Sequence, residues 1–409
     1  MVAMSIDTGK IPPLFSPEFQ RDPYPTYQQY LRGPSLQPME GRPGIWLLFG
    51  YEACTTVIRD SRLSAVPLAS FLVAVPEDGL PEFDDLINHI RRQLIRLDAP
   101  RHTEMRKLMN RGFTPIVIER LKPTVQAIID RLLGDLQDLE TIDLIRDFAY
   151  PLPVRVISEL LGVPEELQAR CIALSNDIAV FAGDARRPPD PARLAQQAVR
   201  ELYGYFAAII RERRGTVKED LLTLLIDVAD NVKMFTEEEL YAQCVLLLVA
   251  GHETTRNLIG NGVYTLLTHP TVYKELQEDE ALLVPVVEEL LRYESPAQAI
   301  VRTVKADIEF DGTHLRAGST VVFMIGAANR DPRQFPDPDR LDVRRTHNRH
   351  LAFGGDSHVC LGTTLARLEG RLSINALARR FPNLRLAEGQ PDWGMNFALR
   401  GLNTLRVHT

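Results

Sequence analysis

The chain has 409 residues, of which 45% are hydrophobic and 25% charged, and its formal net charge is −7. This composition is ordinary for a soluble globular protein and argues against a disordered chain. The acidic balance disfavours a nucleic-acid-binding protein, which is more often basic overall. No stretch supplies the ~18 apolar residues that a membrane-spanning helix needs, so we expect no membrane association.

Four cysteines lie far apart in the chain, and no two of them form a CxxC pair. They are Cys54, Cys171, Cys244 and Cys360. This spacing predicts neither a disulfide framework nor a zinc knuckle. The first residues lack the basic segment and apolar run of a signal peptide. Both observations favour a reducing, cytoplasmic location.

The N-terminal part is expected to contain little regular structure. Residues 1–22 are predicted to be extended, and Pro23 is expected to start a short helix toward Leu31. A strand is expected at Ile45–Phe49 and a helix at Tyr51–Asp60. Ser64–Asp98 mixes prolines with apolar residues, which predicts a long irregular connection. Such connections are uncommon unless functional, although a surface loop would look the same.

Beyond Pro100 the apolar residues recur at three- and four-residue steps, which predicts a mostly helical chain. Helices are expected at Arg101–Arg111, Pro115–Leu136, Leu144–Leu161, Pro164–Phe181, Pro191–Arg214 and Asp220–Asp230. The segment Gly183–Asp190 separates two of them. Thr236 and Glu239 match a capping box, and the helix that follows is predicted to continue to Leu267, on the order of 45–50 Å.

The C-terminal third alternates helices with strands. A helix is expected to end at Tyr293, and another is expected at Thr363–Phe381. Strands are expected at Ala299–Thr303, Ile308–Phe310 and Thr320–Met324, and a small hairpin is expected from Asn396–Arg400 and Thr404–His408. The whole pattern predicts a mainly α protein with small β-sheets.

One cysteine, Cys360, lies in a glycine-rich loop just before an amphipathic helix. The loop reads Leu-Ala-Phe-Gly-Gly-Asp-Ser-His-Val-Cys-Leu-Gly over residues 351–362. Glycines allow the backbone to approach a flat cofactor, and the helix N-terminus favours a thiolate at Cys360. An isolated cysteine is nevertheless more often an inert buried thiol, so the decision depends on the rest of the chain.

The middle of the longest helix carries polar residues inside an apolar run. Glu253 and Thr254 follow Gly251, whose missing side chain leaves space beside the helix. A threonine at such a position commonly bonds the carbonyl four residues back. A zinc-protease HExxH motif is excluded because Arg256 replaces the second histidine.

Two further spacings bring charged groups onto one helix face. His102 and Arg106 are one helical turn apart, and Glu289 and Arg292 are three residues apart. Each pair taken alone predicts only a surface group of little energetic consequence.

Together these motifs resemble the cytochrome P450 family of haem-thiolate monooxygenases. Three motifs follow one another along the chain in the same order as in the family. They are Ala-Gly-x-Glu-Thr, Glu-x-x-Arg and, last, Phe-Gly-x-x-x-His-x-Cys-x-Gly. Asp356 departs from the family, which usually has glycine there. The resemblance implies one catalytic domain over residues 1–409 with the triangular, mainly helical fold, and a monomer.

The resemblance also implies a haem b cofactor bound to iron through Cys360. Glu253 and Thr254 would deliver protons to dioxygen. The implied haem contacts are His102, Arg106, Arg302 and His358 at the propionates, Ala250 and Gly251 on the oxygen side, and Phe353 and Gly354 in the cysteine loop. Glu289 and Arg292 would be structural and joined by a third basic residue, for which we favour Arg340 over Arg344 and Arg345.

The expected substrate is a lipophilic or natural-product-like small molecule. By resemblance its pocket would be lined by Leu72, Phe83, Phe181, Leu247, Ala299, Ile300 and Phe397. Electrons would come from a separate ferredoxin and ferredoxin reductase, so NAD(P)H would act only indirectly. Basic residues for such a partner are Arg101, Lys107, Arg111, Arg367 and Arg371. The alternatives are a haem-binding ligand sensor and a tailoring protein that catalyses a non-oxygenative step.

Overall fold

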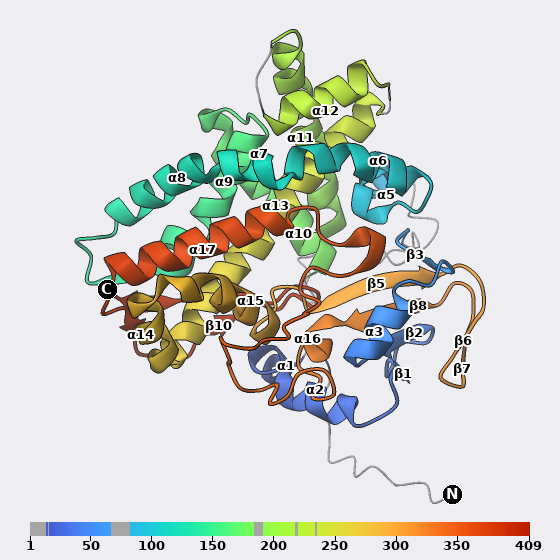
Figure 1. Cartoon of the computed structure of the whole chain (residues 1–409). Helices are drawn as coiled ribbons and strands as arrows, with labels where there is room; N and C mark the ends of the chain where they lie inside the picture. Colours follow the sequence, from blue (N-terminus) through green and yellow to red (C-terminus); the bar gives the residue numbers. More distant parts are fainter. Residues whose placement is uncertain (1–13, 15, 67–81, 184–190, 217–219, 234) are drawn as a thin grey trace, which may run out of the picture.

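The computed structural model describes residues 14, 16–66, 82–183, 191–216, 220–233 and 235–409 (Figure 1). Helices make up most of it, and a smaller region of β-sheet lies beside them. This arrangement confirms the predicted mainly α fold with small sheets. Among the described residues, no helix combines the length and the apolar character needed to cross a membrane.

The largest sheet joins strands from both ends of the chain. Its order is β1-β2-β8-β5-β3, and its strands are Leu36–Pro38, Ile45–Leu48, Thr320–Met324, Ala299–Val304 and Leu63–Ser64. The β2 and β8 strands pair in parallel and the other neighbours are antiparallel. A separate hairpin, β6 (Ile308–Phe310) with β7 (Thr313–Leu315), turns at Asp311-Gly312, where both residues have positive φ. Figure 1 shows the N-terminal strands beside the C-terminal ones.

The prediction of an extended N-terminal segment is wrong over the part that the structure describes. Residues 17–21 form α1 (Pro17–Arg21), which Ser16 caps by accepting a hydrogen bond from the Phe19 amide at 3.1 Å. Pro17 suits the first helical turn because its missing N–H has no helical partner there. The predicted helices that follow are present as α2 (Tyr24–Leu31) and α3 (Tyr51–Val57).

The predicted irregular connection is wrong after residue 83. A helix, α5 (Asp84–Arg92), is followed by a 3₁₀ turn, η2 (Leu94–Arg96). Leu86, Ile87 and Ile90 are buried in the main core, at the spacing of one helix face. Residues 67–81 lie outside the described part of the chain.

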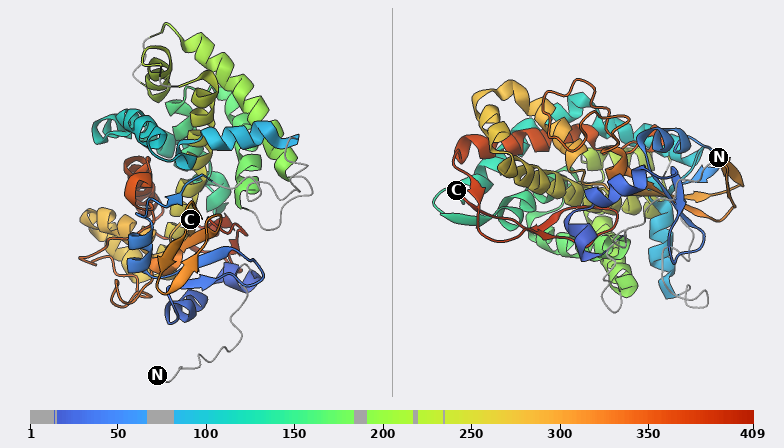
Figure 2. Two further views of the ribbon diagram at one scale, coloured as in Figure 1. Left: turned by 90° about the vertical axis from the view of Figure 1, so that its right-hand side faces the viewer. Right: turned by 90° about the horizontal axis from the view of Figure 1, so that it is seen from below.

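The remaining helices pack around one central helix, α13 (Glu237–Thr268), which Figure 2 shows running through the helical part. Its capping box is present, as predicted, with Thr236 and Glu239 each accepting from the other's amide. The helices around it contribute to a single large apolar core. They are α6 (Arg101–Met109), η3 (Asn110–Phe113), α7 (Pro115–Arg120), α8 (Lys122–Gly134), α9 (Pro151–Leu160), α10 (Glu165–Gly183), α11 (Pro191–Arg213), α12 (Leu221–Asp230), α14 (Pro270–Glu278), η5 (Glu280–Leu282), α15 (Leu283–Tyr293) and α17 (Thr363–Arg380). The short α16 (Ile325–Ala328) packs instead against α2 and α3, beside the largest sheet.

Two predicted helices are interrupted at prolines. Pro115–Leu136 divides into α7 and α8, with Pro123 in the first turn of α8. Leu144–Leu161 divides into a π-helix at Ile145–Ala149 and α9, which begins at Pro151. A proline fits the first turn of a helix but breaks the hydrogen bonds of a helix interior, so each proline restarts the helix.

The predicted C-terminal hairpin is wrong. The last strand, β12 (Arg406–His408), pairs with β4 (Thr141–Asp143) and β9 (Arg385–Leu386). The preceding β11 (Leu402–Thr404) pairs with β10 (Asp392–Trp393). Near residue 396, the Asn396 side chain accepts hydrogen bonds from the amides of Ala398 and Leu399, which closes a local turn instead of a strand.

The buried pair of Glu289 and Arg292 is present on α15, with two hydrogen bonds of 2.7 and 2.9 Å. The third basic residue is Arg345, whose Nε lies 3.3 Å from Glu289 Oε2 with 7% of its side chain exposed. The prediction of Arg340 is wrong, because its side chain is exposed and only its carbonyl takes part, accepting from Arg292 Nη2 at 3.2 Å. A turn at Asp337, where φ is +47°, leads into this segment.

Arg345→Met is expected to lower the free energy of unfolding by about 2 kcal/mol, because it removes a charged hydrogen-bond donor from a buried carboxylate. Arg340→Met removes the same charge from an exposed position and should leave stability within about 0.5 kcal/mol of the wild type. Urea unfolding of both variants provides the comparison. Equal losses in the two would contradict the assignment of Arg345.

Candidate functional site

The cysteine loop is a closed turn that ends at α17. The Cys360 amide donates to the Phe353 carbonyl at 2.9 Å, and the Gly354 amide donates to the Leu351 carbonyl at 2.8 Å. Gly354 has a φ of +72°, which glycine adopts without strain. Asp356 has a φ of +56° at the start of η6 (Asp356–His358), which confirms that aspartate is accommodated in left-handed geometry here.

Because Asp356 already occupies a backbone conformation that glycine prefers, Asp356→Gly is expected to retain haem binding and to change stability by less than about 1 kcal/mol. The haem content of the purified variant and its thermal unfolding test this. A variant that cannot bind haem would show instead that the aspartate side chain is required.

The thiol of Cys360 is accessible within this loop. Of the four cysteines, all of which the structure describes, Cys360 alone is exposed. The surrounding protein raises its pKa by desolvation, while the Gly362 amide, Arg106 and Arg367 act in the opposite direction. The helix N-terminus therefore offsets only part of the cost of a thiolate.

Four predicted cofactor contacts come together beside the loop from three separate elements. The His102 ring, on α6, stacks on the His358 ring of the loop with centroids 3.9 Å apart. Arg302, on β5, is 9% exposed, and the one hydrogen bond its side chain makes to a described residue goes to the neighbouring Val301 carbonyl. His102 Nε2 is buried and has no hydrogen-bond partner among the residues that the structure describes. We call this group, completed by Arg106, the cationic recess.

The cationic recess is short of negative charge. Burial, and then Arg302, lower the pKa of His358 to about 3, and burial followed by Arg106 and Arg302 lowers the pKa of His102. Both imidazoles are therefore neutral near pH 7. Asp98 lies close but is engaged by Ser64 at 2.6 Å and the Ala65 amide at 2.9 Å. A buried ring nitrogen that can donate and has no described partner, beside guanidinium groups without an ion pair to a described residue, suits an anionic ligand such as a carboxylate.

Two predicted residues of α13 lie at an opening in an otherwise buried helix. Ala250 is exposed, although Leu246, Leu247 and Leu248 just before it are buried. The Thr254 hydroxyl donates to the Ala250 carbonyl at 2.9 Å, which is the bond expected of an ordinary helical threonine. The helix thus presents a small, open surface at Ala250.

The prediction that the missing side chain of Gly251 leaves open space beside the helix is wrong. A Cβ at Gly251 would lie 3.2 Å from Ile157 of α9. The glycine therefore allows α9 to approach α13 closely, and it does not open a groove. Small residues at such contacts let two helices pack at short range.

The neighbours of Glu253 include groups that the sequence did not single out. Arg256 lies 3.7 Å from the Glu253 carboxylate in a partly buried pair. His252 Nδ1 donates to the Leu248 carbonyl at 2.9 Å, and its Nε2 lies 3.2 Å from Asn176 Oδ1. Asn176 in turn donates to the Tyr150 hydroxyl at 2.7 Å. His252 stood in the motif itself, whereas its partners on α10 and before α9 carry no signal in the sequence.

The proposed substrate-pocket residues are not shown to line a common cavity. Leu72 lies outside the described residues. Phe83, Phe181 and Leu247 belong to the main core, whereas Ala299 and Phe397 pack with the N-terminal helices. Ile300 lies at the cysteine loop, 3.2 Å from where a Cβ on Gly354 would be. Their common role remains a prediction.

Two of the basic residues expected on the partner surface have carboxylate partners. Arg101 pairs with Glu239 at 2.7 Å. Arg367 pairs with Glu288 through two hydrogen bonds of 2.6 and 2.7 Å and lies over the Phe353 ring. Arg367 thereby fixes an aromatic residue of the cysteine loop.

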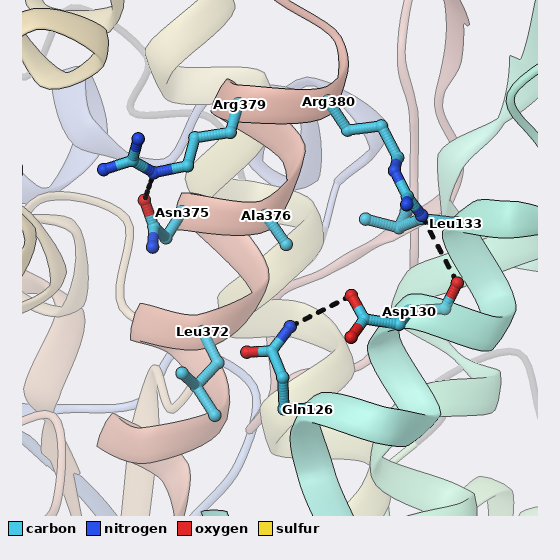
Figure 3. A pocket seen from close by; sticks show the side chains of 8 residues that line it. All are labelled: Gln126, Asp130, Leu133, Leu372, Asn375, Ala376, Arg379 and Arg380. Atoms are coloured by element: carbon cyan, nitrogen blue, oxygen red, sulfur yellow. Dashed lines mark hydrogen bonds between the residues drawn. The ribbon is translucent and has the colours of Figure 1, made fainter. Parts of the chain in front are cut away.

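A pocket of about 310 Å³ lies between α8 and α17 (Figure 3). Its residues are Gln126, Asp130, Leu133, Leu372, Asn375, Ala376, Arg379 and Arg380. Its polar groups bond one another or nearby residues, as with Gln126 and Asp130 at 3.1 Å. None of them is a predicted site residue.

An accessible cysteine in a closed loop beside a cationic recess is the arrangement of a haem-thiolate protein. The cytochrome P450 family model matches residues 187–395. The chain is 41% identical to the cytochrome P450 monooxygenase PikC of Streptomyces venezuelae, over 95% of this chain and 92% of that protein. It is 36% identical to the 6-deoxyerythronolide B hydroxylase of Saccharopolyspora erythraea, over 97% and 98%.

A solved structure of P450BioI in complex with a hexadec-9Z-enoic acid ligated acyl carrier protein is also similar, with 34% identity and a TM-score of 0.89. It is covered over its whole length, and 96% of this chain is matched. The chain belongs to the cytochrome P450 family. It is a P450 monooxygenase, an oxidoreductase that uses haem and dioxygen.

Proposed function

We propose that the chain oxidises a lipophilic, natural-product-like small molecule in secondary metabolism, as one catalytic domain over residues 1–409. The relatives named as a monooxygenase and a 6-deoxyerythronolide B hydroxylase support this substrate class. The observation that carries the proposal is the position of Cys360, the one exposed cysteine, beside the cationic recess.

The residues of the recess and the loop suit a haem. Cys360 would bind the iron, and His102, Arg106, Arg302 and His358 would hold the two propionates. Phe353 and Gly354 would shape the loop, and Ala250 would lie on the oxygen side. A bound thiolate-ligated haem supplies dioxygen activation, as the thiolate donates electron density that favours O–O cleavage.

Protein side chains supply the protons. Glu253, held by Arg256, and the Thr254 hydroxyl are the groups that can hold and pass a proton at the open part of α13. A hydroxyl that donates to a carbonyl still has lone pairs to accept a hydrogen bond from water. This pair favours an enzyme over a haem-binding ligand sensor, which needs no proton delivery.

Electrons are proposed to come from a ferredoxin and its reductase, with NAD(P)H acting only through them. Lys107 and Arg111 are exposed on or just after α6 and suit an acidic partner. The carrier protein in the P450BioI structure makes a tethered substrate a second possibility for this chain, to be tested by comparing free and carrier-bound substrates.

The reduced, carbon-monoxide-bound absorption spectrum tests the haem ligand. A thiolate-type Soret band is expected for the wild type and for Cys171→Ala, a control at a buried cysteine. Cys360→Ser should lose this band. A wild-type band typical of histidine or neutral ligation would exclude Cys360 as the ligand. Oxygen consumption is also measured with surrogate redox proteins. If no lipophilic compound that shifts the haem spectrum causes oxygen to be consumed, the result would favour the ligand sensor.

A further inference from the structure

Arg96 is a partly buried basic side chain to which the described residues offer no partner. It ends the short η2 turn ahead of α6. Its Nε is buried without a hydrogen bond, and no ion pair or hydrogen bond joins its side chain to another residue of the described chain. Burial lowers its pKa. A guanidinium so placed is costly unless an anion accompanies it.

The anion must lie where Arg96 and the cationic recess meet. Arg96 and Arg302 are brought together by the strands beside them, because Asp98, two residues after Arg96, accepts a hydrogen bond from Ser64, and Ser64 pairs with Thr303 next to Arg302. In agreement, burial and then the charge of Arg96 lower the pKa of Arg302 to about 10. Arg302 in turn lies close to His102 and His358. The charge of Arg96 thus adds to a recess that already lacks negative charge.

The carboxylates nearby do not neutralise this charge. Asp98 is held by Ser64, the Ala65 amide and Lys305. Asp356 bonds Ser357 and acts on the recess only at a distance. Two guanidinium groups that lie close enough to repel each other, while the nearby carboxylates bond other groups, match a ligand that brings its own carboxylate.

We infer that Arg96 is a fifth anchoring residue for the haem propionates, contributed by η2 and acting with Arg302 on the same carboxylate. The inference rests on the proposed haem site at Cys360. None of the other four residues comes from the η2 turn, so Arg96 would tie this segment to the cofactor. The signal in the sequence is a single arginine two residues before Asp98, which no pattern distinguishes from a surface residue.

The inference predicts a faster loss of haem when the charge is removed. Arg96→Met keeps the aliphatic stem and deletes the guanidinium. Transfer of haem from the loaded protein to excess apomyoglobin, followed in the Soret band, should be about tenfold faster or more, as expected for a charge-assisted hydrogen bond. Arg91→Met, at an exposed arginine on α5, should release haem at the wild-type rate.

A second cofactor separates propionate binding from a structural role. Each protein is reconstituted with haem dimethyl ester, in which both carboxylates are blocked. The difference between wild type and Arg96→Met should then disappear. An equal acceleration with both cofactors, or wild-type release by Arg96→Met with ordinary haem, would overturn the inference. Arg96→Gln, measured in the same way, replaces the methionine variant if the latter does not fold.

The proposed function can fail separately. If the wild-type protein does not show a thiolate-type Soret band, the haem site itself is wrong. If that band is present and Arg96→Met releases haem at the wild-type rate, only the role of Arg96 is wrong.

Discussion

Glu369→Gln is expected to gain stability relative to the wild type as the pH rises, by roughly 3–5 kcal/mol in the free energy of unfolding between pH 5 and pH 8.5. Glu369 lies on α17 and is 1% exposed, and no group in the described part of the chain forms a hydrogen bond with its Oε2. One turn further along the helix, the buried Ser373 hydroxyl likewise has no hydrogen bond to a described residue. Burial therefore raises the pKa of Glu369 from 4.5 to about 8.

The sign follows from proton binding in the two states. The unfolded chain releases this proton near pH 4.5, whereas the folded protein keeps it until about pH 8. The stability that the neutral acid provides is complete below pH 4.5 and is lost as the pH rises to 8. Glutamine has the shape of the neutral acid and does not titrate, so it does not lose this stability.

The haem-loaded wild type and Glu369→Gln are unfolded in urea at pH 5, 7 and 8.5. The measured effect is the change with pH in the difference between their free energies of unfolding. Glu278→Gln provides a control at an exposed carboxylate on α14. A difference between Glu369→Gln and wild type that stays constant over this range would show that Glu369 is not held neutral in the folded protein.

Glu253→Gln is expected to lower the rate of product formation by about 10²-fold, the usual contribution of a positioned acid or base. The amide keeps the size of the side chain but cannot exchange a proton. Thr254→Val should have an effect of similar size, because it removes the hydroxyl while keeping a branched side chain. Substrate affinity should change little in both variants.

Conservative variants separate proton delivery from packing. Thr254→Ser restores the hydroxyl and should retain most of the activity, and Glu253→Asp retains a titratable group. Product formation and oxygen consumption are measured together, with a substrate identified by its shift of the haem spectrum. If Glu253→Gln and Thr254→Val form product at the wild-type rate, the assignment of these residues to proton delivery is wrong.

Much of the fold could be predicted because its signals are local. The capping box of Thr236 and Glu239 marks the start of α13, and apolar residues at helical spacing mark most of the other helices. The cysteine loop could be recognised for the same reason. Its glycines, His358 and Cys360 lie within one short segment, and their spacing by itself indicates a cofactor-binding loop.

The choice among distant partners could not be predicted. Arg340 and Arg345 are equivalent in the sequence, and only the path of the chain through the turns at Asp337 and Asp342 decides which one meets Glu289. The last strand alternates in the same way whether it pairs with its neighbour or with β4. The sequence predicts open space beside Gly251, but in the folded protein the Ile157 side chain occupies that space.

The sequence by itself therefore determined the helices, the loop around Cys360 and the family, because periodicity and contiguous motifs depend on neighbouring residues alone. Only the tertiary structure decided which polar and charged groups find no countercharge among the described residues. His102, Arg302 and Arg96 come from separate elements, and each would be a solvated surface group if its element stood alone. Packing removes water from them together, and this desolvation creates the demand for an anionic ligand.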